Sequence, residues 1–251
     1  MNDLDGVRSW STEDGAVMSA LQRPDGAWSI RLPEDHVTAW AALLSMVTAD
    51  LSGALLVSRP GGQSVEVDSV LRRAGFTPAR SETVWRLPVA GLLARLSVRT
   101  VHRIVPVTSL EAHSVAALDN SIRRDIPGTG GWVGTGAQLT ASLDDPEFDP
   151  ALYLVAQHSM SGSLDGLIRV WNRSPEPRLG CIGVTRPWRR TRLALALVQQ
   201  IAGTLHARGV THITAETDAT NHDSHLMATH HGGEPVQTTI EWQNTRPGRP
   251  V

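Results

Sequence analysis

Apolar and polar residues alternate in short runs through the first part of the chain, which predicts strands with one buried face. The turn sequences TEDG and RPDG separate these runs. Two longer segments repeat apolar residues at helical spacing, and the second ends at Gly75, a residue type suited to a helix C-terminus. The pattern predicts helices at residues 34–51 and 64–76, and strands at residues 6–11, 16–22, 27–32, 53–59 and 83–89.

The second part of the chain continues with both kinds of pattern, and its clearest helix covers residues 192–210. Further helices are predicted at residues 109–126, with Ser109 as the N-cap, and at residues 137–145 and 221–233. Strands are predicted at residues 97–107, 151–158, 164–172, 177–185, 211–218 and 236–243. The order of all these elements indicates an α/β fold with a mixed sheet.

A weak internal repeat is visible in the order of the predicted elements. Residues 70–87 and 226–243 share one plan, in which a helix, a glycine, a turn and a final strand follow one another. Residues 28–44 and 180–198 share a second plan of strand, turn and helix. The first part of the chain is therefore predicted to repeat the later half of the second part.

The repeat suggests a division into two domains. We expect an N-terminal domain at residues 1–93 and a second domain at residues 97–245. Residues 246–251 are rich in proline and arginine and are expected to form a loose tail.

Composition places the chain among globular proteins and narrows its partners. Its 251 residues are 41% hydrophobic and 19% charged, with a formal net charge of -2 at pH 7. A nearly neutral chain is a poor match for nucleic acid or an anionic membrane, and no apolar stretch is long enough to span a bilayer. We expect neither as a partner, and the sequence leaves open whether the protein is a homodimer.

Residue types also limit the compartment and the chemistry. The single cysteine, Cys181, cannot form a disulfide within the chain, and the first residues lack the apolar core of a signal peptide. Both features favour a cytoplasmic location. Lysine does not occur, so that chemistry requiring it, such as Schiff-base formation or a Walker motif, is excluded.

Positive charge gathers at one place, the sequence RPWRRTRLALAL at residues 186–197. Its four arginines lie between a predicted strand and the clearest predicted helix. The first amides of a helix have no partner within the helix, and with the helix dipole they attract anions. The position therefore favours a phosphate or pyrophosphate held at the helix start rather than a general basic surface.

Residues 182–197 resemble the coenzyme A loop of the GNAT superfamily of N-acetyltransferases, whose pattern is Q/R-x-x-G-x-G/A after a short strand. Arg189 takes the first place of the pattern, Leu193 the fifth and Ala194 the last. Asn221 and Gly232 match an asparagine and a glycine that follow in the family. The resemblance in element order covers residues 97–245, and the first part of the chain resembles a degenerate half of such a domain.

The resemblance implies an N-acetyltransferase that uses acetyl-CoA as co-substrate, needs no metal, and transfers the acetyl group directly to a primary amine. Backbone groups of Ile182 and Val184 would pair with the pantetheine arm, and Asn221 would contact the cofactor. The pyrophosphate would lie in a cradle after Arg189, formed by Arg190, Thr191, Arg192, Leu193 and Ala194. The acceptor is a small molecule or a peptide N-terminus that the sequence does not identify.

Two positions depart from the family pattern. Arg192 stands where a glycine lets the backbone approach the pyrophosphate, and its side chain can either add a phosphate contact or crowd the cradle. Ala228 stands where the family usually has a tyrosine that protonates the leaving thiolate. The general acid is therefore unassigned, and a non-catalytic module that binds acyl-CoA is the alternative function.

Carboxylates near the predicted cleft are candidates for the base that takes the amine proton. Glu216 matches the glutamate that has this role in GNAT enzymes acting on protein N-termini, and Asp218 is a second candidate. A solvated strand glutamate, or a partner for a nearby arginine, also explains Glu216.

Other candidates border the predicted site. Arg124, Asp125 and Trp132 lie beside or within a glycine-rich loop and are candidates for acceptor contacts, with ordinary packing and solvated charge as the alternative. His222 and His225 are one helical turn apart, but a zinc site needs further ligands that the sequence does not indicate. In the first part, the counterpart of the arginine turn, residues 31–40, is acidic. Since carboxylates repel pyrophosphate, the first domain is expected not to bind coenzyme A.

Overall fold

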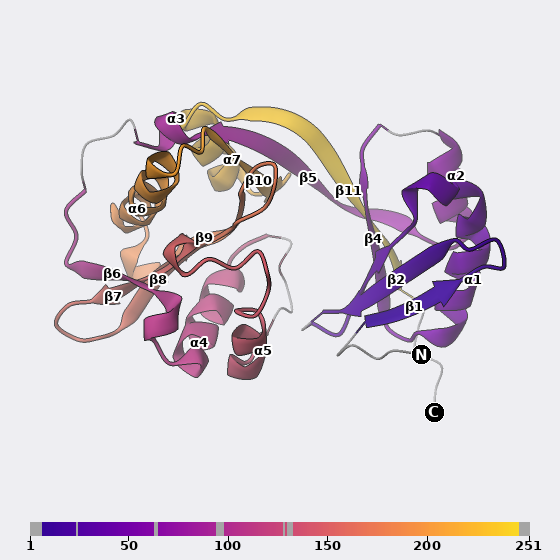
Figure 1. The fold of residues 1–251 in the computed structure, drawn as a ribbon, viewed down its shortest axis with the longest axis horizontal. Coiled ribbons are helices and arrows are strands. Elements are labelled where there is room, and N and C mark those ends of the chain that lie inside the picture. The colour runs from indigo at the N-terminus through magenta and orange to yellow at the C-terminus, as the bar shows by residue number, and fades with distance from the viewer. Residues whose placement is uncertain are drawn as a thin grey trace. The chain divides into compact units, whose positions relative to one another are not determined.

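The computed structural model describes residues 7–23, 25–62, 65–93, 98–127, 129 and 133–245. These residues form two compact units (Figure 1). The first unit falls within Met1–Glu82 and Gln237–Val251, and the second is Thr83–Val236. The predicted tail at residues 246–251 lies outside the described residues. No helix of the described part is both long and apolar enough to cross a membrane.

The first unit is a sheet with two helices on one face. Its strand order is β1-β2-β3-β4-β11-β5, where β3 and β4 are parallel and β1, β2 and β3 form antiparallel neighbours. The short strands are β1 (Val7–Ser11), β2 (Val17–Gln22), β3 (Trp28–Arg31) and β4 (Ala54–Pro60). The helical elements are η1 (Glu34–Ala39), α1 (Trp40–Asp50) and α2 (Val65–Arg73).

The core of the first unit lies between these helices and the sheet. Trp40 and Leu43 of α1 and Leu71 of α2 are fully buried against Met18 and Trp242 from the strands. Burying each large apolar side chain contributes about 1.5–3 kcal/mol. This core therefore accounts for the helical apolar spacing that the sequence shows at residues 34–51 and 64–76.

The second unit has helices on both faces of its sheet. Its strand order is β5-β10-β9-β8-β7-β6, with antiparallel pairing from β6 to β9 and parallel pairing of β9 with β10. The strands are β6 (His102–Pro106), β7 (Tyr153–His158), β8 (Leu164–Trp171), β9 (Arg178–Val184) and β10 (His212–Asp218). The helices are α3 (Val89–Leu93), α4 (Ala112–Arg123), α5 (Gly136–Ala141), α6 (Leu193–Ala207) and α7 (His222–His230).

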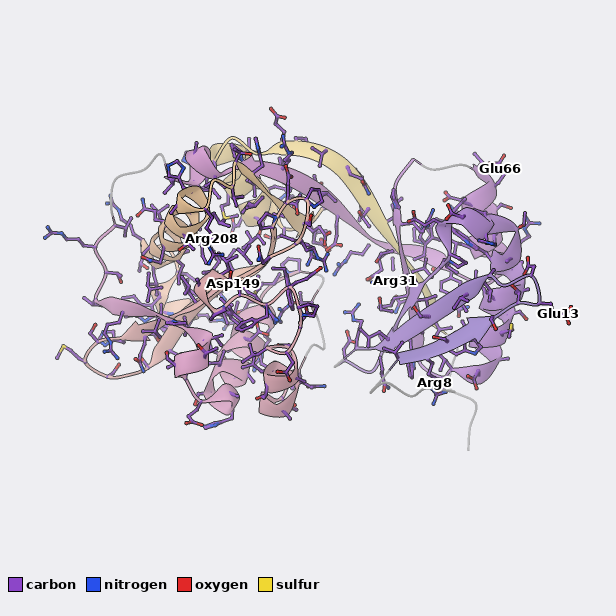
Figure 2. The ribbon with its side chains drawn as sticks, viewed as in Figure 1. Arg8, Glu13, Arg31, Glu66, Asp149 and Arg208 are labelled. Carbon is purple, nitrogen blue, oxygen red and sulfur yellow. The ribbon has the colours of Figure 1, made fainter. Side chains whose placement is uncertain are left out.

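Two apolar clusters hold these layers together. Helices α4 and α5 bury Val115 and Leu139 against Val155 and Leu167 of the sheet. On the other face, α6 buries residues such as Leu197 and Ile201 against Leu154, Ile168 and Ile213. The C-terminal end of α6 is fixed by Arg208, whose Nη1 lies 2.5 Å from Asp149 Oδ2 (Figure 2).

The predicted fold and repeat are confirmed. The sheet is mixed, and β3-η1-α1-β4-α2-β5 has the same element order as β9-η4-α6-β10-α7-β11, where η4 is Arg186–Trp188. Some local predictions were wrong. The N-cap of α4 is Glu111, because Ser109 ends a 3-10 turn and its hydroxyl donates to the Pro106 carbonyl. The predicted strand at residues 97–107 begins only at His102.

The compact units divide the chain elsewhere than at residues 93–97. Strands β5 (Thr77–Pro88) and β11 (Glu234–Thr245) have 12 residues each, about 40 Å at the usual rise. The second unit contains β5 from Thr83 onward, and the first unit contains β11 from Gln237 onward. The final strand of each repeat therefore contributes residues to both units.

Candidate functional site

A cleft of about 480 Å³ opens in the second unit where β9 and β10 separate. The parallel pairing of these strands comprises Arg178 with Thr214 and Leu179 with Ala215, and the described residues beyond show no further pairing. Four elements line the cleft: the end of α4, the end of β9, the turn before α6, and the start of α7. The cleft therefore brings together segments that are far apart in the sequence.

The β9 wall of the cleft presents an open strand edge. Ile182 and Val184 both line the cleft, and their strand pairs with β8 on its other side. Between them, a Cβ at Gly183 would lie 2.3 Å from Ile122 Cγ2, so that glycine permits α4 to pack closely here. An unpaired strand edge can hydrogen-bond an extended ligand, as the predicted pantetheine arm requires.

The arginine turn lines the cleft through Arg189 and Arg190, and its backbone carries a local strain. Arg190 has φ 60°, and it is the one non-glycine residue of the described part with positive φ. Arg192, where the family pattern has glycine, is the N-cap of α6 with φ -87° and ψ 10°. The left-handed conformation that favours glycine therefore falls at Arg190, while the backbone of Arg192 is relaxed.

Several amides of this turn are available to a ligand. The Thr191 hydroxyl donates to the Trp188 carbonyl at 2.6 Å and accepts from the Leu193 amide at 3.2 Å. The amides of Arg190, Arg192 and Ala194 make no hydrogen bond to a described residue. Leu193 anchors the turn, because its side chain is buried in the core under α6. The turn thus has the unpartnered helix-start donors that suit an anion.

Charge at the turn is divided between paired and unpaired arginines. The Asp125 carboxylate accepts from Arg186 Nε at 3.1 Å, from Arg186 Nη2 at 2.7 Å and from Arg189 Nη2 at 2.5 Å. Hydrogen bonds from Arg186 and then Arg189 lower the pKa of Asp125 well below its usual range. The exposed Arg190 and Arg192 have no ion pair with a described residue. Asp125, which the sequence predicts to contact the acceptor substrate, is therefore paired with Arg186 and Arg189 of the turn.

Helix α7 supplies the opposite wall. Asn221 is its N-cap, and Asn221 Oδ1 accepts from the Ser224 amide at 3.1 Å. Asn221, Asp223 and Ser224 all line the cleft. The resemblance to the GNAT family indicates Asn221 as a cofactor contact. Its role as the N-cap of α7 accounts for its position in the fold without a ligand. Residues two and three positions after an N-cap lie beside it, which is the signal that could have identified Asp223 and Ser224.

The carboxylates proposed as bases lie outside this lining. Glu216 forms an ion pair with Arg178 on the neighbouring strand, and neither residue lines the cleft. Asp218 is buried and accepts from the Thr220 amide at 2.8 Å and the Thr220 hydroxyl at 2.6 Å. Both carboxylates thus have structural partners.

Arg124 and Cys181 are absent from the described lining of the cleft. Arg124 is the exposed C-cap of α4 and does not line the cleft, and Trp132 lies outside the described residues. Cys181 faces α4 behind the cleft, where burial raises the pKa of its thiol to about 11. In the described part of the chain, no group of three or more acidic, histidine or cysteine side chains is arranged to hold a metal.

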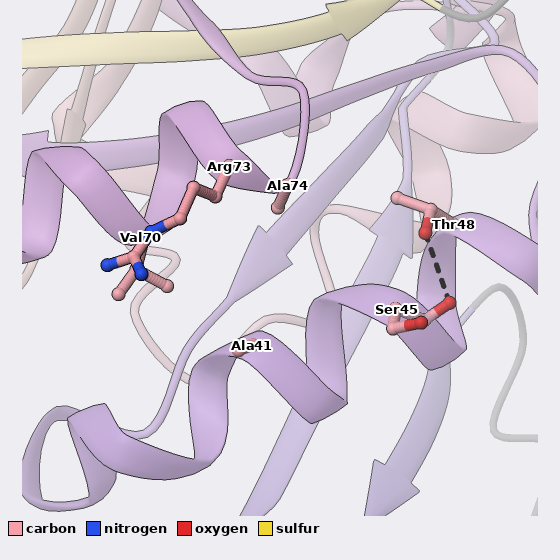
Figure 3. Close-up of a pocket in the computed structure, with 6 residues that line it drawn as sticks. All are labelled: Ala41, Ser45, Thr48, Val70, Arg73 and Ala74. Atoms are coloured by element: carbon pink, nitrogen blue, oxygen red, sulfur yellow. Dashed lines mark hydrogen bonds between the residues drawn. The ribbon is translucent and has the colours of Figure 1, made fainter.

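The first unit has hollows of a different kind. One of about 320 Å³ lies between α1 and α2, where Arg73 is the charged residue among small neighbours such as Ala41, Ser45 and Ala74 (Figure 3). Another, of about 600 Å³, lies where β3 and β4 end and corresponds in topology to the β9/β10 cleft. Glu34 lines it and forms a 3.8 Å ion pair with Arg59. An acidic residue is thus present at the counterpart of the arginine turn.

Neither a protein-family model nor a curated protein sequence matches the chain. Solved structures do. The chain is similar to a GCN5-related N-acetyltransferase from Sphaerobacter thermophilus, with a TM-score of 0.69 and 19% identity over 100% of this chain and 85% of that one. It is also similar to a GCN5-related N-acetyltransferase from Kribbella flavida, with a TM-score of 0.63 and 15% identity over 96% of this chain and 90% of that one.

These likenesses establish the fold: the chain has the GNAT acyltransferase fold. A tandem GNAT protein from the clavulanic acid biosynthesis pathway is similar as well, with a TM-score of 0.66 and 15% identity over 97% of this chain and 84% of that one. Its tandem arrangement matches the two repeats seen here, so that the predicted GNAT-like character of both halves is confirmed at the level of fold.

Proposed function

We propose that the protein is an N-acyltransferase that binds acetyl-CoA in the β9/β10 cleft and transfers the acetyl group to a primary amine. The observation that carries the proposal is the arginine turn, which places unpartnered helix-start amides and exposed arginines at a cleft between separating parallel strands. A pyrophosphate suits those amides, and an extended arm suits the open edge of β9. The acceptor is a small amine or a peptide N-terminus.

In the proposed reaction, the amine nitrogen bonds to the acetyl carbon and the carbon–sulfur bond breaks. The amine nitrogen gives up one proton. The sulfur leaves with the electrons of the broken bond and gains one proton. The chain positions the reactants and stabilises the charge that develops on sulfur. Ser224 is the hydroxyl side chain of the described lining, and it lies in the first turn of α7, where the helix dipole favours negative charge.

The two roles of Glu216 make different predictions. If Glu216 is the base, Glu216→Gln lowers kcat/KM most at low pH and leaves acetyl-CoA affinity unchanged. If Glu216 serves only as the ion-pair partner of Arg178, the same substitution leaves turnover unchanged at every pH. The ion pair and the position of Glu216 outside the lining favour the second role.

The alternative is a non-catalytic module that binds acyl-CoA and does not turn it over. It is favoured by the state of the carboxylates, because Glu216 is paired with Arg178 and Asp125 with two arginines. It also agrees with Ala228, whose buried methyl group cannot act as a proton donor.

Calorimetry with acetyl-CoA, followed by thiol release across a panel of amines, separates the two functions. We expect one acetyl-CoA per chain, because the first unit lacks the arginine turn. Arg190→Glu is expected to weaken binding at least tenfold, whereas Arg103→Glu, the same change at an exposed residue of β6, is expected to leave it unchanged. Binding without turnover on any amine supports the module, and absence of binding contradicts both functions.

A further inference from the structure

The ion pairs of Asp125 connect two walls of the cleft. Asp125 follows α4, whereas Arg186 and Arg189 lie at the two ends of η4 in the turn before α6. Arg186 contacts the carboxylate through two nitrogens, at 3.1 Å and 2.7 Å, and Arg189 through one, at 2.5 Å. Both Asp125 and Arg189 line the cleft, so that the carboxylate meets the turn within the cleft lining.

From this geometry we propose that Asp125 is a positioning residue, which holds the Arg189 guanidinium ready to donate to the phosphates of the ligand. The inference rests on the proposed function, and the ligand chemistry is a diphosphate on an extended arm. Asp125 makes no contact with the ligand and acts through Arg189.

The pattern of donors supports positioning rather than competition for the ligand. A guanidinium has five N–H donors, and Asp125 takes one nitrogen of Arg189, Nη2. The other nitrogens of Arg189 remain able to bond a phosphate while the ion pair persists. Arg186 contributes a second positive charge to the same carboxylate, so that Asp125, Arg186 and Arg189 together carry a net positive charge. An anion therefore meets an oriented guanidinium, and binding does not have to order the long Arg189 side chain at a loss of conformational entropy.

A second carboxylate of the cleft provides a matched control. Asp223 also lines the cleft, but it forms no ion pair with a described residue. Removing either carboxylate removes one negative charge from the cleft, which by itself strengthens anion binding. The difference between the Asp125 and Asp223 variants therefore isolates the effect of orienting Arg189.

The test compares Asp125→Ala, Asp125→Asn and Asp223→Asn by calorimetry with acetyl-CoA and with S-acetylpantetheine, which carries no phosphate. For both Asp125 variants we expect the Kd for acetyl-CoA to rise about tenfold, with the Kd for S-acetylpantetheine unchanged. Because it removes the same charge without touching Arg189, Asp223→Asn is expected to lower the Kd for acetyl-CoA relative to that for S-acetylpantetheine. In an Arg189→Ala background, Asp125→Ala should cost no further affinity, because Asp125 acts through Arg189.

The outcomes separate this inference from the proposed function. Wild-type protein that binds no acetyl-CoA contradicts both. Wild-type binding together with unchanged or tighter acetyl-CoA binding by Asp125→Asn contradicts the positioning role alone. Equal loss of affinity for both ligands also contradicts it, since that result marks a general disruption of the cleft. The isosteric Asp125→Asn keeps the test valid where thermal unfolding shows Asp125→Ala to be unfolded.

Discussion

Arg190 has a backbone conformation that glycine tolerates and that costs other residues roughly 1–2 kcal/mol. Its side chain is exposed, so that packing does not explain the strain. We expect Arg190→Gly to have a free energy of unfolding about 1 kcal/mol higher than Arg190→Ala, because both lose the arginine and glycine alone relieves the conformation. Urea denaturation of the two variants measures the difference. Equal stability would show that the turn changes its backbone when the arginine is removed.

Ser224 allows a prediction about the leaving sulfur. Its amide is held by Asn221, and Ser224 belongs to the described lining of the cleft. We expect Ser224→Ala to lower kcat roughly 10- to 100-fold with little change in acetyl-CoA affinity, because a hydroxyl that bonds a developing thiolate acts mainly in the transition state. Steady-state kinetics and calorimetry test this together. Ser224→Thr, which keeps the hydroxyl, is the control, and an unchanged kcat in the alanine variant would remove Ser224 from the reaction.

At the residue scale, a sequence indicates where a side chain falls along an element better than which side chain it contacts. Ile182, Val184, Arg189, Arg190, Ala194 and Asn221 all line the described cleft, because they lie at the end of β9, in the turn before α6 or at the starts of α6 and α7. The predicted cradle residues Thr191, Arg192 and Leu193 are not part of this lining. The pairing of Asp125 with Arg186 cannot be predicted from the sequence pattern, because it joins residues 61 positions apart. Such a contact depends on how α4 packs against β9, and that packing has no local sequence signal. For Glu216, the sequence allows an arginine partner as an alternative but does not identify Arg178.

At the scale of elements, the apolar pattern located helices well and long strands incompletely. The predicted helix at residues 192–210 corresponds to α6, since its apolar stripe is buried in one core. The prediction for β5 began at residue 83, whereas the strand begins at Thr77. Its first residues are exposed or half-buried and include Pro78, Arg80 and Glu82, so that no apolar alternation marks them. These first residues belong to the strand because they pair with a neighbouring strand, which the composition of the segment does not reveal.

The junction of η3 (Pro150–Leu152) with the end of α6 gives a prediction with a pH dependence. Asp149 caps η3 through the Ala151 amide and pairs with Arg208 (Figure 2). Burial opposes ionisation of Asp149, but the bonds from Arg208 and Ala151 outweigh it and lower the pKa. Asp149→Ala is expected to lower the free energy of unfolding by about 1–2 kcal/mol at pH 7.

The sign of the pH effect follows from the lowered pKa. A carboxyl whose pKa is lowered by folding stabilises the protein above its unfolded pKa, about 3.9, and this contribution is lost as the pH falls through the folded value. The difference between wild type and Asp149→Ala should therefore be constant from pH 7 to about 5 and shrink below pH 4. Denaturation across this range measures it, with Asp144→Ala as a control that has no ion pair with a described residue. A difference that grows at low pH would contradict the assignment.

At the scale of the whole molecule, the ends of β5 and β11 make the two sequence repeats depend on each other. Trp85 and Leu87 of β5 and Val89 and Leu92 of α3 belong to the core of the second unit, and Trp85 Nε1 donates to Thr217 Oγ1 at 2.8 Å. Trp242 of β11 belongs to the core of the first unit. The predicted boundary at residues 93–97 would separate four of these side chains from the core that they fill.

We therefore expect a fragment of residues 97–245 not to fold on its own, although it contains the whole coenzyme A resemblance. It lacks four core side chains worth about 1.5–3 kcal/mol each, and their sum is comparable to the 5–15 kcal/mol that stabilise a typical domain. A fragment of residues 83–236 retains them and is expected to show a cooperative thermal transition by circular dichroism, with retained acetyl-CoA binding by calorimetry. If the 97–245 fragment unfolds as cooperatively and at as high a temperature as the 83–236 fragment, the contribution of β5 to the second unit is not needed for its stability.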